Sequence, residues 1–472
     1  MKSVFRVLAA AAVLLVAGCG HVQNLPINQP VADANAGLDE ILRDRDPDAR
    51  EDDLIVGLAF SGGGTRAAAF SFGVLKEMAN GQVTVRGRRV SLIDHIDFIT
   101  GVSGGAVPAA YYGLKRRDAL VDFRERFLIR DAEESLNTAV SLGNIGKALG
   151  GGINEDTRFR TWLDANLFDG ATFSSLLTER RPRIWINATD IYSGTPFVFG
   201  KTAFSAICSD LASYPIASAV AASAAVPLVF APIIVEAYPD RCNARLPVWI
   251  EKALNNPNAP PLLRAFAQGI ARYRDGTVKY IKLLDGGLVD NFGLSGFTIG
   301  RESSEVPYGP LTQTQAARLR RILFLVVDAG QAPQGDWARV LEGPSGADLI
   351  NAVTGAALNA SVRASYSAFD STMSAWRNAI IGWRCALPAA QAQRLRGSVG
   401  PWNCRDLKVY VGRISFDQLD PERAKRLGAV VTRFKLPVET VDDLIAAGGE
   451  ALTRNPKYRE FLGAPVLPLT GR

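Results

Sequence analysis

Histidine is nearly absent from this chain, since only His21 and His95 occur among 472 residues. Most serine hydrolases use a histidine, held by a carboxylate, to take the proton of the nucleophile. His21 lies in a polar segment near the N-terminus, where we expect no fixed position. His95 precedes the apolar run 96–99, and a strand there, at about 3.3 Å per residue, would separate it from any group that follows the run. A histidine-activated nucleophile is therefore not expected.

The same shortage argues against a metal centre. The five cysteines include no C-x-x-C pair, and zinc sites in proteins are built mainly from closely spaced cysteine and histidine ligands. We expect no metal, and the chemistry inferred below needs no organic cofactor.

An excess of one charge is also missing. The 53 Lys and Arg residues against 47 Asp and Glu give a formal net charge of +6, and removal of residues 1–18, with Lys2 and Arg6, would leave +4. Basic residues gather only in two short clusters, which we expect to be solvated surface. They are Arg86 with Arg88 and Arg89, and Lys115 with Arg116 and Arg117. This composition argues against a nucleic-acid-binding protein.

Long apolar runs are scarce, and one of them stands at the N-terminus. Lys2 and Arg6 precede the uncharged stretch Val7 to Ala17, which suits a signal-peptide core and is too short to span a bilayer. Val16-Ala17-Gly18-Cys19 resembles a bacterial lipobox, which implies cleavage before Cys19 and lipidation of that residue. The alternative is an ordinary secretory signal with a fortuitous cysteine. Gly20 implies the outer membrane under the usual sorting pattern of lipoproteins.

Export would place the remaining cysteines in an oxidising compartment. Cys208, Cys242, Cys385 and Cys404 are even in number, and four cysteines allow three pairings that sequence alone cannot separate. We favour pairing of sequence neighbours, Cys208 with Cys242 and Cys385 with Cys404. Residues 20–53 are polar and rich in charge, and we expect a tether or an arm along the surface.

Serine, by contrast, occurs in a suggestive setting. Gly101-Val102-Ser103-Gly104-Gly105 follows the apolar run 96–99, and G-x-S-x-G sequences present nucleophilic serines at sharp turns after strands. A second apolar run, Tyr280 to Leu284, ends in Asp285-Gly286-Gly287, which alone could be a plain turn. In an open parallel sheet, reactive groups gather at the carboxyl ends of strands. We therefore expect Ser103 and Asp285 to meet there, with the carboxylate as the base.

A glycine-rich loop supplies a third component. The strand expected at Leu54 to Phe60 runs into Ser61-Gly62-Gly63-Gly64-Thr65-Arg66 and then a helix-like segment. Consecutive glycines let backbone amides turn inward, and a helix N-terminus adds partial positive charge. Gly62, Gly63, Gly64 and Arg66 are therefore candidates for an oxyanion hole. For Arg66, an ordinary surface cation is the alternative.

These blocks occur in the order found in patatin-like phospholipases, and the chain resembles that family. The resemblance rests on Gly62 to Arg66, Gly101 to Gly105, Ala222-Ser223-Ala224-Ala225-Val226-Pro227, and Asp285 to Gly287. It covers roughly residues 54–330, and Leu407 to Phe461 resembles the tail of some bacterial members. It implies a three-layer α/β/α fold with a mostly parallel central sheet and a Ser103–Asp285 dyad. Ser103 would attack an ester carbonyl, and Asp285 would be the base.

Nucleotide binding is the rival interpretation of the glycine loop. Gly62-x-Gly64-x-x-Ala67 matches the G/A form of the dinucleotide fingerprint. That fingerprint needs an acidic residue about 20 positions on to bind the ribose, where this chain has Arg86, Arg88 and Arg89. A P-loop is excluded because no Gly-Lys-Ser/Thr follows the glycines.

Outside these blocks the chain can be placed only coarsely. Buried strands are expected at Arg183 to Ile191 and Ile322 to Asp328, and a further strand at Leu407 to Phe416. The proline-rich segment 236–279 is either a lid over the site or a passive surface excursion. Ser223 lies in a run of small residues, and we expect it to be structural rather than a second nucleophile. An apolar stripe at helical spacing is expected to pack on the core; it comprises Val353, Leu358, Val362, Tyr366, Phe369, Met373, Trp376 and Ile380.

The sequence thus predicts four segments: a signal peptide (1–18), a tether (19–53), a catalytic domain (54–335) and a C-terminal helical extension packed on that domain (336–472). It predicts a membrane-anchored serine acyl hydrolase of the bacterial cell envelope that cleaves ester-linked acyl chains of phospholipids or lysophospholipids. Its expected partners are the lipid substrate and, through Cys19, the membrane. One alternative is a patatin-like protein that binds lipid or an envelope partner without turnover. A nucleotide-binding protein is the other.

Overall fold

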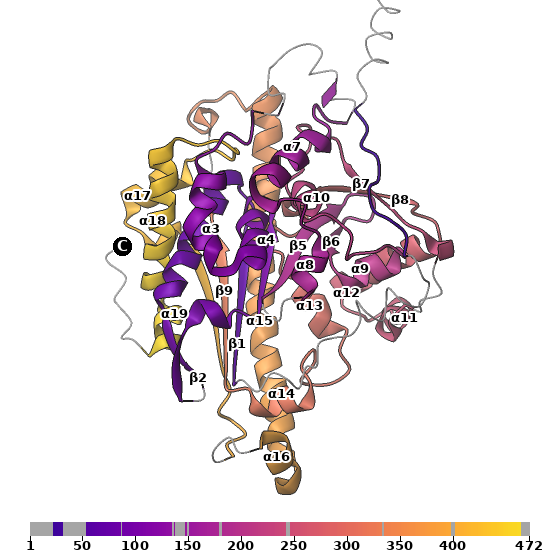
Figure 1. The fold of residues 1–472 in the computed structure, drawn as a ribbon, viewed down its shortest axis with the longest axis vertical. Coiled ribbons are helices and arrows are strands. Elements are labelled where there is room, and N and C mark those ends of the chain that lie inside the picture. The colour runs from indigo at the N-terminus through magenta and orange to yellow at the C-terminus, as the bar shows by residue number, and fades with distance from the viewer. Residues whose placement is uncertain are drawn as a thin grey trace, which may run out of the picture.

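The computed structural model describes residues 22–31, 53–85, 87–134, 136, 147–148, 151–178, 182–241, 246–332, 335–397 and 402–463. Within these ranges an eight-stranded sheet lies between helices on both of its faces (Figure 1). Each face carries its own cluster of buried apolar side chains. This arrangement confirms the three-layer α/β/α fold predicted from the sequence.

The central sheet is mostly parallel. Its order is β10-β9-β1-β4-β5-β8-β7, with β6 paired to β5. The first five strands of this order run parallel, whereas β6 and β8 are antiparallel to β5, and β7 is antiparallel to β8. The strands are β1 (Leu54–Phe60), β4 (Phe98–Val102), β5 (Arg183–Asp190), β6 (Thr195–Phe199), β7 (Ile233–Glu236), β8 (Tyr280–Asp285), β9 (Arg321–Asp328) and β10 (Lys408–Ser415). A separate antiparallel pair is formed by β2 (Gln82–Val85) and β3 (Arg88–Ser91).

The helices explain why the central strands are apolar on both faces, because a strand covered on both sides needs no polar alternation. One face carries α3 (Gly64–Asn80), α4 (Ala106–Lys115), α10 (Ile216–Ser223) and α18 (Val438–Arg454); the other carries α13 (Ser295–Glu302), α14 (Gln313–Arg318) and α15 (Gly346–Cys385). Further helices are α5 (Ala119–Phe123), α7 (Asp156–Leu163), α8 (Phe173–Thr178), α9 (Lys201–Ala206), α11 (Val248–Asn255), α12 (Pro261–Arg274), α16 (Ala389–Arg396), α17 (Pro421–Gly428) and α19 (Pro456–Leu462).

The C-terminal third of the chain is part of the same sheet. The segment expected to be a helical extension also contributes β10, which pairs in parallel with β9 along its whole length. From the same third, α18 packs directly on α3, where a Cβ atom on Gly73 would lie 2.0 Å from the carbonyl oxygen of Ile445. Residues after 335 therefore complete the core rather than only covering it.

The helix predicted around the apolar stripe is α15, but the stripe is buried only in its second half. Phe369, Met373, Trp376 and Ile380 are buried, whereas Val353 is 61% exposed. The reason is length: a helix of 40 residues is about 60 Å long, and the eight-residue strand β9 is about 26 Å long. The first turns of α15 project past the sheet, so the core packing expected for Val353 is wrong.

Residues 22–31 lie along the body as an arm. Pro30 forms an isolated antiparallel bridge with Ser209, and the Val31 amide donates to the Cys208 carbonyl at 3.0 Å. Cys385 and Cys404 form a disulfide, which is one of the two pairings favoured from the sequence. Cys208 is also disulfide-bonded, but its expected partner Cys242 lies outside the described residues.

The proline-rich segment contains α11 and α12, which form a side wall of the molecule (Figure 1). The hydroxyl of Tyr273, on α12, donates to Asp190 Oδ2 at the end of β5 at 2.8 Å. Phe266 and Ile270 of the same helix are buried in the core. This packing favours a structural role over that of a lid.

Cys19 and His21, like the whole expected signal peptide, lie outside the described residues. Among the helices that are described, none has the length and apolar character needed to cross a bilayer.

Candidate active site

Ser103 occupies a strained turn at the end of β4. The strand ends at Val102, and a single 3₁₀ turn, Ser103–Gly105, leads into α4. The φ angle of Ser103 is +51°, which is uncommon for a residue with a Cβ atom and is found at nucleophilic turns between a strand and a helix. A Cβ atom on Gly104 would lie 2.0 Å from the carbonyl oxygen of Gly64. Only glycine at position 104 therefore lets the serine turn touch the glycine-rich loop.

Asp285 lies next to Ser103, but the strand that carries it does not run in the predicted direction. We expected both residues at the carboxyl ends of parallel strands, but β8 runs antiparallel to β5. Val102 is opposite Asn187 of β5, and Asp285 is opposite the next residue, Ala188. Over these residues β6 occupies one edge of β5. β4 and β8 therefore share the opposite edge of β5, and the carboxyl ends of these two strands meet. The expected parallel direction of β8 is wrong, and the meeting of its end with that of β4 explains why the two side chains are close.

The two side chains are buried and hydrogen-bonded to each other. The Ser103 hydroxyl bonds to the Asp285 carboxylate, whose Oδ1 atom also accepts from the Gly287 amide at 2.8 Å. Ser103 is 3% exposed and Asp285 is 9% exposed. Desolvation raises the pKa of Asp285 from 3.8 to about 6, against the opposing effect of these two hydrogen bonds. A carboxylate with such a pKa is a better base near neutral pH than an exposed aspartate.

Ser223 supports the nucleophile turn from α10. Its hydroxyl donates to the Asn187 carbonyl at 2.6 Å and accepts from the Ser103 amide at 2.8 Å. The side chain is fully buried. Ser223 therefore links the backbone of β5 to that of Ser103, which agrees with a structural role.

The glycine-rich loop offers two amides rather than three. The Gly62 amide donates to the Asn291 carbonyl at 3.2 Å, so it is occupied and is removed from the predicted oxyanion hole. Gly63 and Gly64 donate to no acceptor within the part of the chain that the structure describes. Both have positive φ angles, and Gly64 begins α3. Two amides at a helix N-terminus, beside the serine turn, suit a developing negative charge.

Comparison with known proteins identifies the family. The model of the patatin-like phospholipase family matches residues 58–298, a range that contains the glycine-rich loop, Ser103 and Asp285. The chain belongs to the patatin-like phospholipase family.

A solved structure and a search of curated proteins complete the comparison. The human GIVD cytosolic phospholipase A2 has a TM-score of 0.30 and 14% sequence identity with this family member. The similarity covers 62% of this chain and 48% of the human chain, so this protein spans about half the length of that relative. No curated protein gives a significant match.

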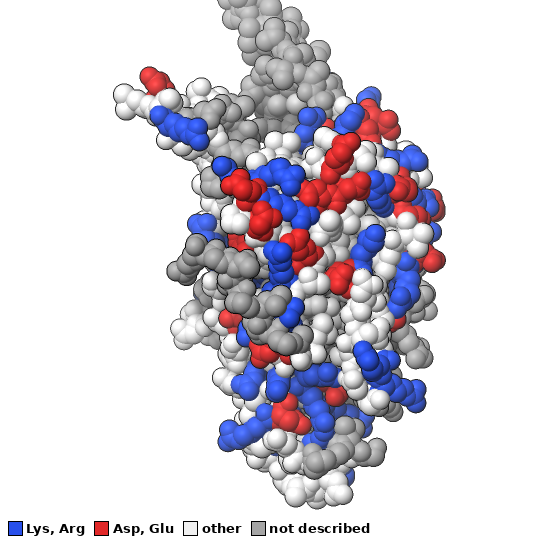
Figure 2. Space-filling view, turned by 90° about the vertical axis from the view of Figure 1, so that its left-hand side faces the viewer, with Lys and Arg blue, Asp and Glu red and all other residues white. Residues whose placement is uncertain are grey.

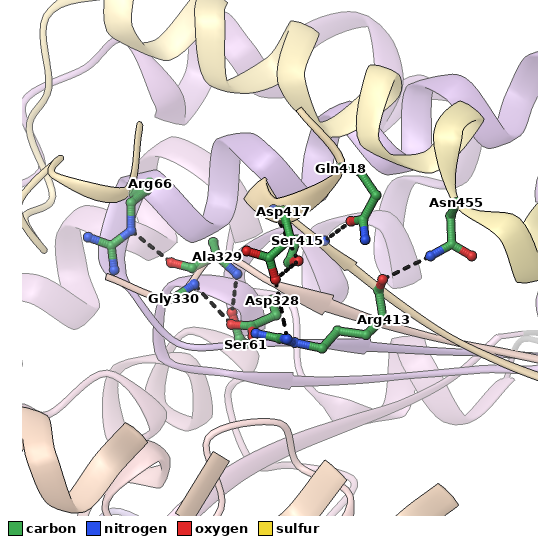
Figure 3. A network of polar contacts seen from close by, with 10 residues as sticks. All are labelled: Ser61, Arg66, Asp328, Ala329, Gly330, Arg413, Ser415, Asp417, Gln418 and Asn455. Carbon is green, nitrogen blue, oxygen red and sulfur yellow. Dashed lines mark hydrogen bonds and ion pairs between the residues drawn. The ribbon is translucent and has the colours of Figure 1, made fainter. Parts of the chain in front are cut away.

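Arg66 connects the glycine-rich loop of this patatin-like chain to Ala329, the residue after β9 (Figure 3). The side chain is 2% exposed, and its Nε atom donates to the Ala329 carbonyl at 2.8 Å. The Ala329 amide donates in turn to Ser61 Oγ at 3.0 Å. Burial lowers the pKa of Arg66 to about 10, against the opposing charge of Asp328. Its guanidinium therefore positions the loop, and the alternative of a surface cation is wrong.

The same network continues into the C-terminal part of the chain. Asp328 Oδ2 accepts from Nη2 of Arg413, on β10, at 2.6 Å. Further along the chain, the Arg433 carbonyl accepts from the Thr65 amide at 2.7 Å, and the Val430 carbonyl accepts from Arg66 Nη1. These C-terminal residues lie beyond the range of the family match. They hold the first turn of α3, where the Gly64 amide is.

Asn291 is a residue of the site that the sequence did not single out. A Cβ atom on Gly62 would lie 2.5 Å from Asn291 Oδ1 and 3.2 Å from Ser103 Cβ. A Cβ atom on Gly287 would lie 2.7 Å from the same Asn291 oxygen. Asn291 therefore lies between the glycine-rich loop and the turn after Asp285. Only its position six residues after Asp285 could have indicated it.

His95 lies away from this site. It ends a 3₁₀ turn, Leu92–His95, before β4, and Ser103 follows the other end of that strand. Among the described residues, no group of three His, Cys, Asp or Glu side chains could hold a metal ion.

Proposed function

We propose that the protein is a serine acyl hydrolase that cleaves ester-linked acyl chains of phospholipids or lysophospholipids. The observation that carries this proposal is the buried hydrogen bond between Ser103 and Asp285, a carboxylate whose pKa is raised to about 6. Membership of the patatin-like phospholipase family supports a lipid ester as the substrate class.

The reaction proceeds in two halves. Ser103 Oγ attacks the ester carbonyl carbon while Asp285 takes the hydroxyl proton, and the amides of Gly63 and Gly64 bind the oxyanion. The intermediate collapses to an acyl-serine, and Asp285 returns the proton to the departing alcohol. Water then attacks the acyl-serine, giving its proton to Asp285, and the acid is released as Ser103 recovers its proton.

The decisive experiment compares wild type with Ser103→Ala and Asp285→Asn on mixtures of phospholipids, lysophospholipids and neutral esters. Both variants should fold and lose fatty-acid release by at least about a thousandfold. A fluorophosphonate probe should label wild type and fail to label Ser103→Ala. Turnover that persists in either variant would refute the dyad, and a wild type that neither hydrolyses nor reacts would support a lipid-binding protein without turnover.

We further propose that Cys19 is lipidated and holds the enzyme on the outer membrane of a bacterial envelope. The lipobox-like Val16 to Cys19 after an apolar stretch supports this proposal. Mass spectrometry of the membrane-bound protein should detect acylated Cys19, and Cys19→Ser should be unacylated.

A further inference from the structure

An exposed apolar stretch of the chain leads into the first turns of α15. It consists of Trp337, Val340, Leu341, Leu349 and Val353, which we call the apolar rim. Leu341 is 99% exposed and Val340 is 57% exposed. Single exposed apolar residues are ordinary on a protein surface, but five within 17 consecutive residues form a cluster of the kind that marks an interaction site.

The apolar rim lies beyond the active-site edge of the sheet. Ser361 of α15 donates to the carbonyl of Val289, four residues after Asp285, at 3.1 Å, which fixes the level of the site along the helix. Leu349 and Val353 precede Ser361 by twelve and eight residues, so at 1.5 Å per residue they project about 18 and 12 Å past that level. Figure 1 shows α15 as the long vertical helix, with its start at the upper end of the molecule.

The N-terminal arm begins at the same end. Asn24 Nδ2 donates to the carbonyls of Ala231 and Pro232, both at 3.0 Å, and its Oδ1 atom accepts from the Asp156 amide at 2.9 Å. In Figure 1 the indigo arm starts at the upper end of the molecule, as α15 does. Cys19 precedes Asn24 by five residues, which span at most about 17 Å when extended. A bilayer that holds a lipidated Cys19 therefore lies close to this end.

The rim is poorer in charge than the face formed by α17 and α18. Residues 349–362 contain no charged side chain, and the segment before them, 337–348, contains Arg339, Glu342 and Asp348. On the face formed by α17 and α18, basic and acidic side chains are intermingled (Figure 2), and Arg423 pairs with Asp443 at 2.7 Å and Arg426 with the same carboxylate at 2.9 Å. That face is an ordinary solvated surface. The rim, with a tryptophan and four aliphatic side chains, has the composition of a segment that lies at the boundary of headgroups and acyl chains.

We propose that the apolar rim docks into the surface of the bilayer to which Cys19 is anchored. This inference rests on the proposed function, since it assumes the lipid anchor and a lipid substrate. Docking turns the carboxyl edge of the sheet, with Ser103 and Asp285, towards the lipid. The rim binds at the surface and does not span the bilayer, because no described helix is long and apolar enough to cross it.

The first test uses Trp337 as a natural probe of depth. The full-length lipoprotein carrying Ser103→Ala is reconstituted in phosphatidylethanolamine–phosphatidylglycerol vesicles that contain brominated acyl chains, which quench nearby tryptophan fluorescence. We expect quenching that disappears in Trp337→Phe, a change that keeps the rim apolar. Quenching that is absent, or equal in both proteins, would overturn the proposal.

The second test measures activity on two substrates. Leu341→Asp combined with Val353→Asp should lower hydrolysis of phospholipid in vesicles by about tenfold or more, because apolar side chains would no longer enter the bilayer. Hydrolysis of a water-soluble short-chain ester should stay unchanged. Val121→Asp is the matched control, since Val121 on α5 is 81% exposed and lies outside the rim. Equal losses in the rim variant and the control would overturn the proposal.

The two tests separate failure of this inference from failure of the proposed function. The quenching experiment uses an inactive variant and needs no turnover. If wild type is inactive on every ester, the proposed function fails while the quenching result still decides the docking. If the soluble ester is hydrolysed and vesicle activity is the same in the rim variant and wild type, only the docking proposal fails.

Discussion

At the scale of single residues, the demands of catalysis and of stability conflict at Asp285. The carboxylate is buried beside Ser103 and has two hydrogen bonds, from the Ser103 hydroxyl and the Gly287 amide. These bonds do not fully replace the water that burial removes, because the pKa remains raised to about 6. The folded protein therefore holds a carboxylate with a pKa near neutral pH at a cost in folding free energy.

The first prediction concerns the pH dependence of activity. Asp285 must be ionised to accept the Ser103 proton, so kcat/KM on a water-soluble ester should fall about tenfold per pH unit below a midpoint near pH 6. The pH profile of purified wild type, measured where the protein stays folded, provides the test. Full activity retained down to pH 4.5 would contradict a desolvated Asp285 as the base.

The second prediction is that Asp285→Asn stabilises the protein while it abolishes activity. The pKa is about 6 in the folded chain, against 3.8 for an unperturbed aspartate, so ionisation favours unfolding. This penalty is absent below pH 4 and complete above pH 6. Asparagine carries no charge and keeps an oxygen for the Gly287 amide. We expect a gain in unfolding free energy of up to about 3 kcal/mol at pH 8, measured by urea unfolding, and a much smaller gain at pH 4. A loss of stability at pH 8 would contradict this explanation.

The third prediction separates two buried serines of α10. Ser223→Ala removes the partner of both the Ser103 amide and the Asn187 carbonyl. The substitution should lower the free energy of unfolding by about 1–3 kcal/mol. It should also lower kcat more than it raises KM, because the nucleophile turn moves. Ser218→Ala is the control, since the Ser218 hydroxyl is equally buried and has no hydrogen-bond partner in the described structure. If both variants behave alike in kinetics and denaturant unfolding, Ser223 does not position the turn.

At the scale of elements, the contact between α3 and α18 connects the glycine-rich loop to the C-terminal part of the chain. The two helices touch backbone to backbone, because a Cβ atom on Gly448 would lie 2.1 Å from the Phe70 carbonyl oxygen. Gly64, a predicted amide donor, begins α3. The position of this donor therefore depends on a helix that lies outside the family match.

The fourth prediction uses two adjacent glycines of α18. Gly448→Ala should force α18 away from α3 and lower the free energy of unfolding by about 1–3 kcal/mol. It should also lower kcat. In Gly449→Ala, the new methyl group meets its nearest atom, Glu77 Cβ, at 3.5 Å. That change should raise stability by about 0.5–1 kcal/mol, because alanine has the better helix propensity. Thermal unfolding checks the opposite signs, and equal effects would show that the helices are not in backbone contact.

The elements also show how far the sequence could predict the site. The strands before Ser103 and Asp285 were predictable, because each is an apolar run that ends in a small turn. The antiparallel direction of β8 was not, because it depends on the pairing with β5 and β7, which no local pattern records. The hydrogen bond of the Gly62 amide was not predictable for the same reason, since its acceptor is the carbonyl of Asn291, 229 residues away along the chain. Sequence thus singled out Ser103 and Asp285 as candidates, and tertiary pairing decided which backbone donors remain for them.

At the scale of the whole molecule, the arm and the long helix α15 both extend to the upper end of the molecule (Figure 1). The helix overshoots the sheet because it has 40 residues, whereas β9 has eight. The arm keeps its place through buried asparagines and some apolar packing, since Asn24 and Asn28 are 4% and 3% exposed, Val31 is 7% exposed, and Ile27 packs against the core. A short polar arm held in this way would fix the orientation of the body relative to a lipid anchor at Cys19.

The last prediction tests that orientation. Asn28→Ala removes hydrogen bonds to the Ser209 hydroxyl at 3.0 Å and the Glu236 carbonyl at 2.9 Å, and one from the Glu236 amide at 2.9 Å. The arm should detach locally, so the Val31 amide should exchange its hydrogen faster by about tenfold or more. Hydrolysis of a soluble ester should not change, because Asn28 is remote from Ser103 in the hydrogen-bond network, whereas hydrolysis in vesicles should fall. Gln29→Ala is the control, since that exposed side chain donates only to the nearby Ile27 carbonyl, at 3.4 Å. If Asn28→Ala frees the arm but leaves vesicle activity intact, the arm does not orient the enzyme, and the apolar rim would have to do so alone.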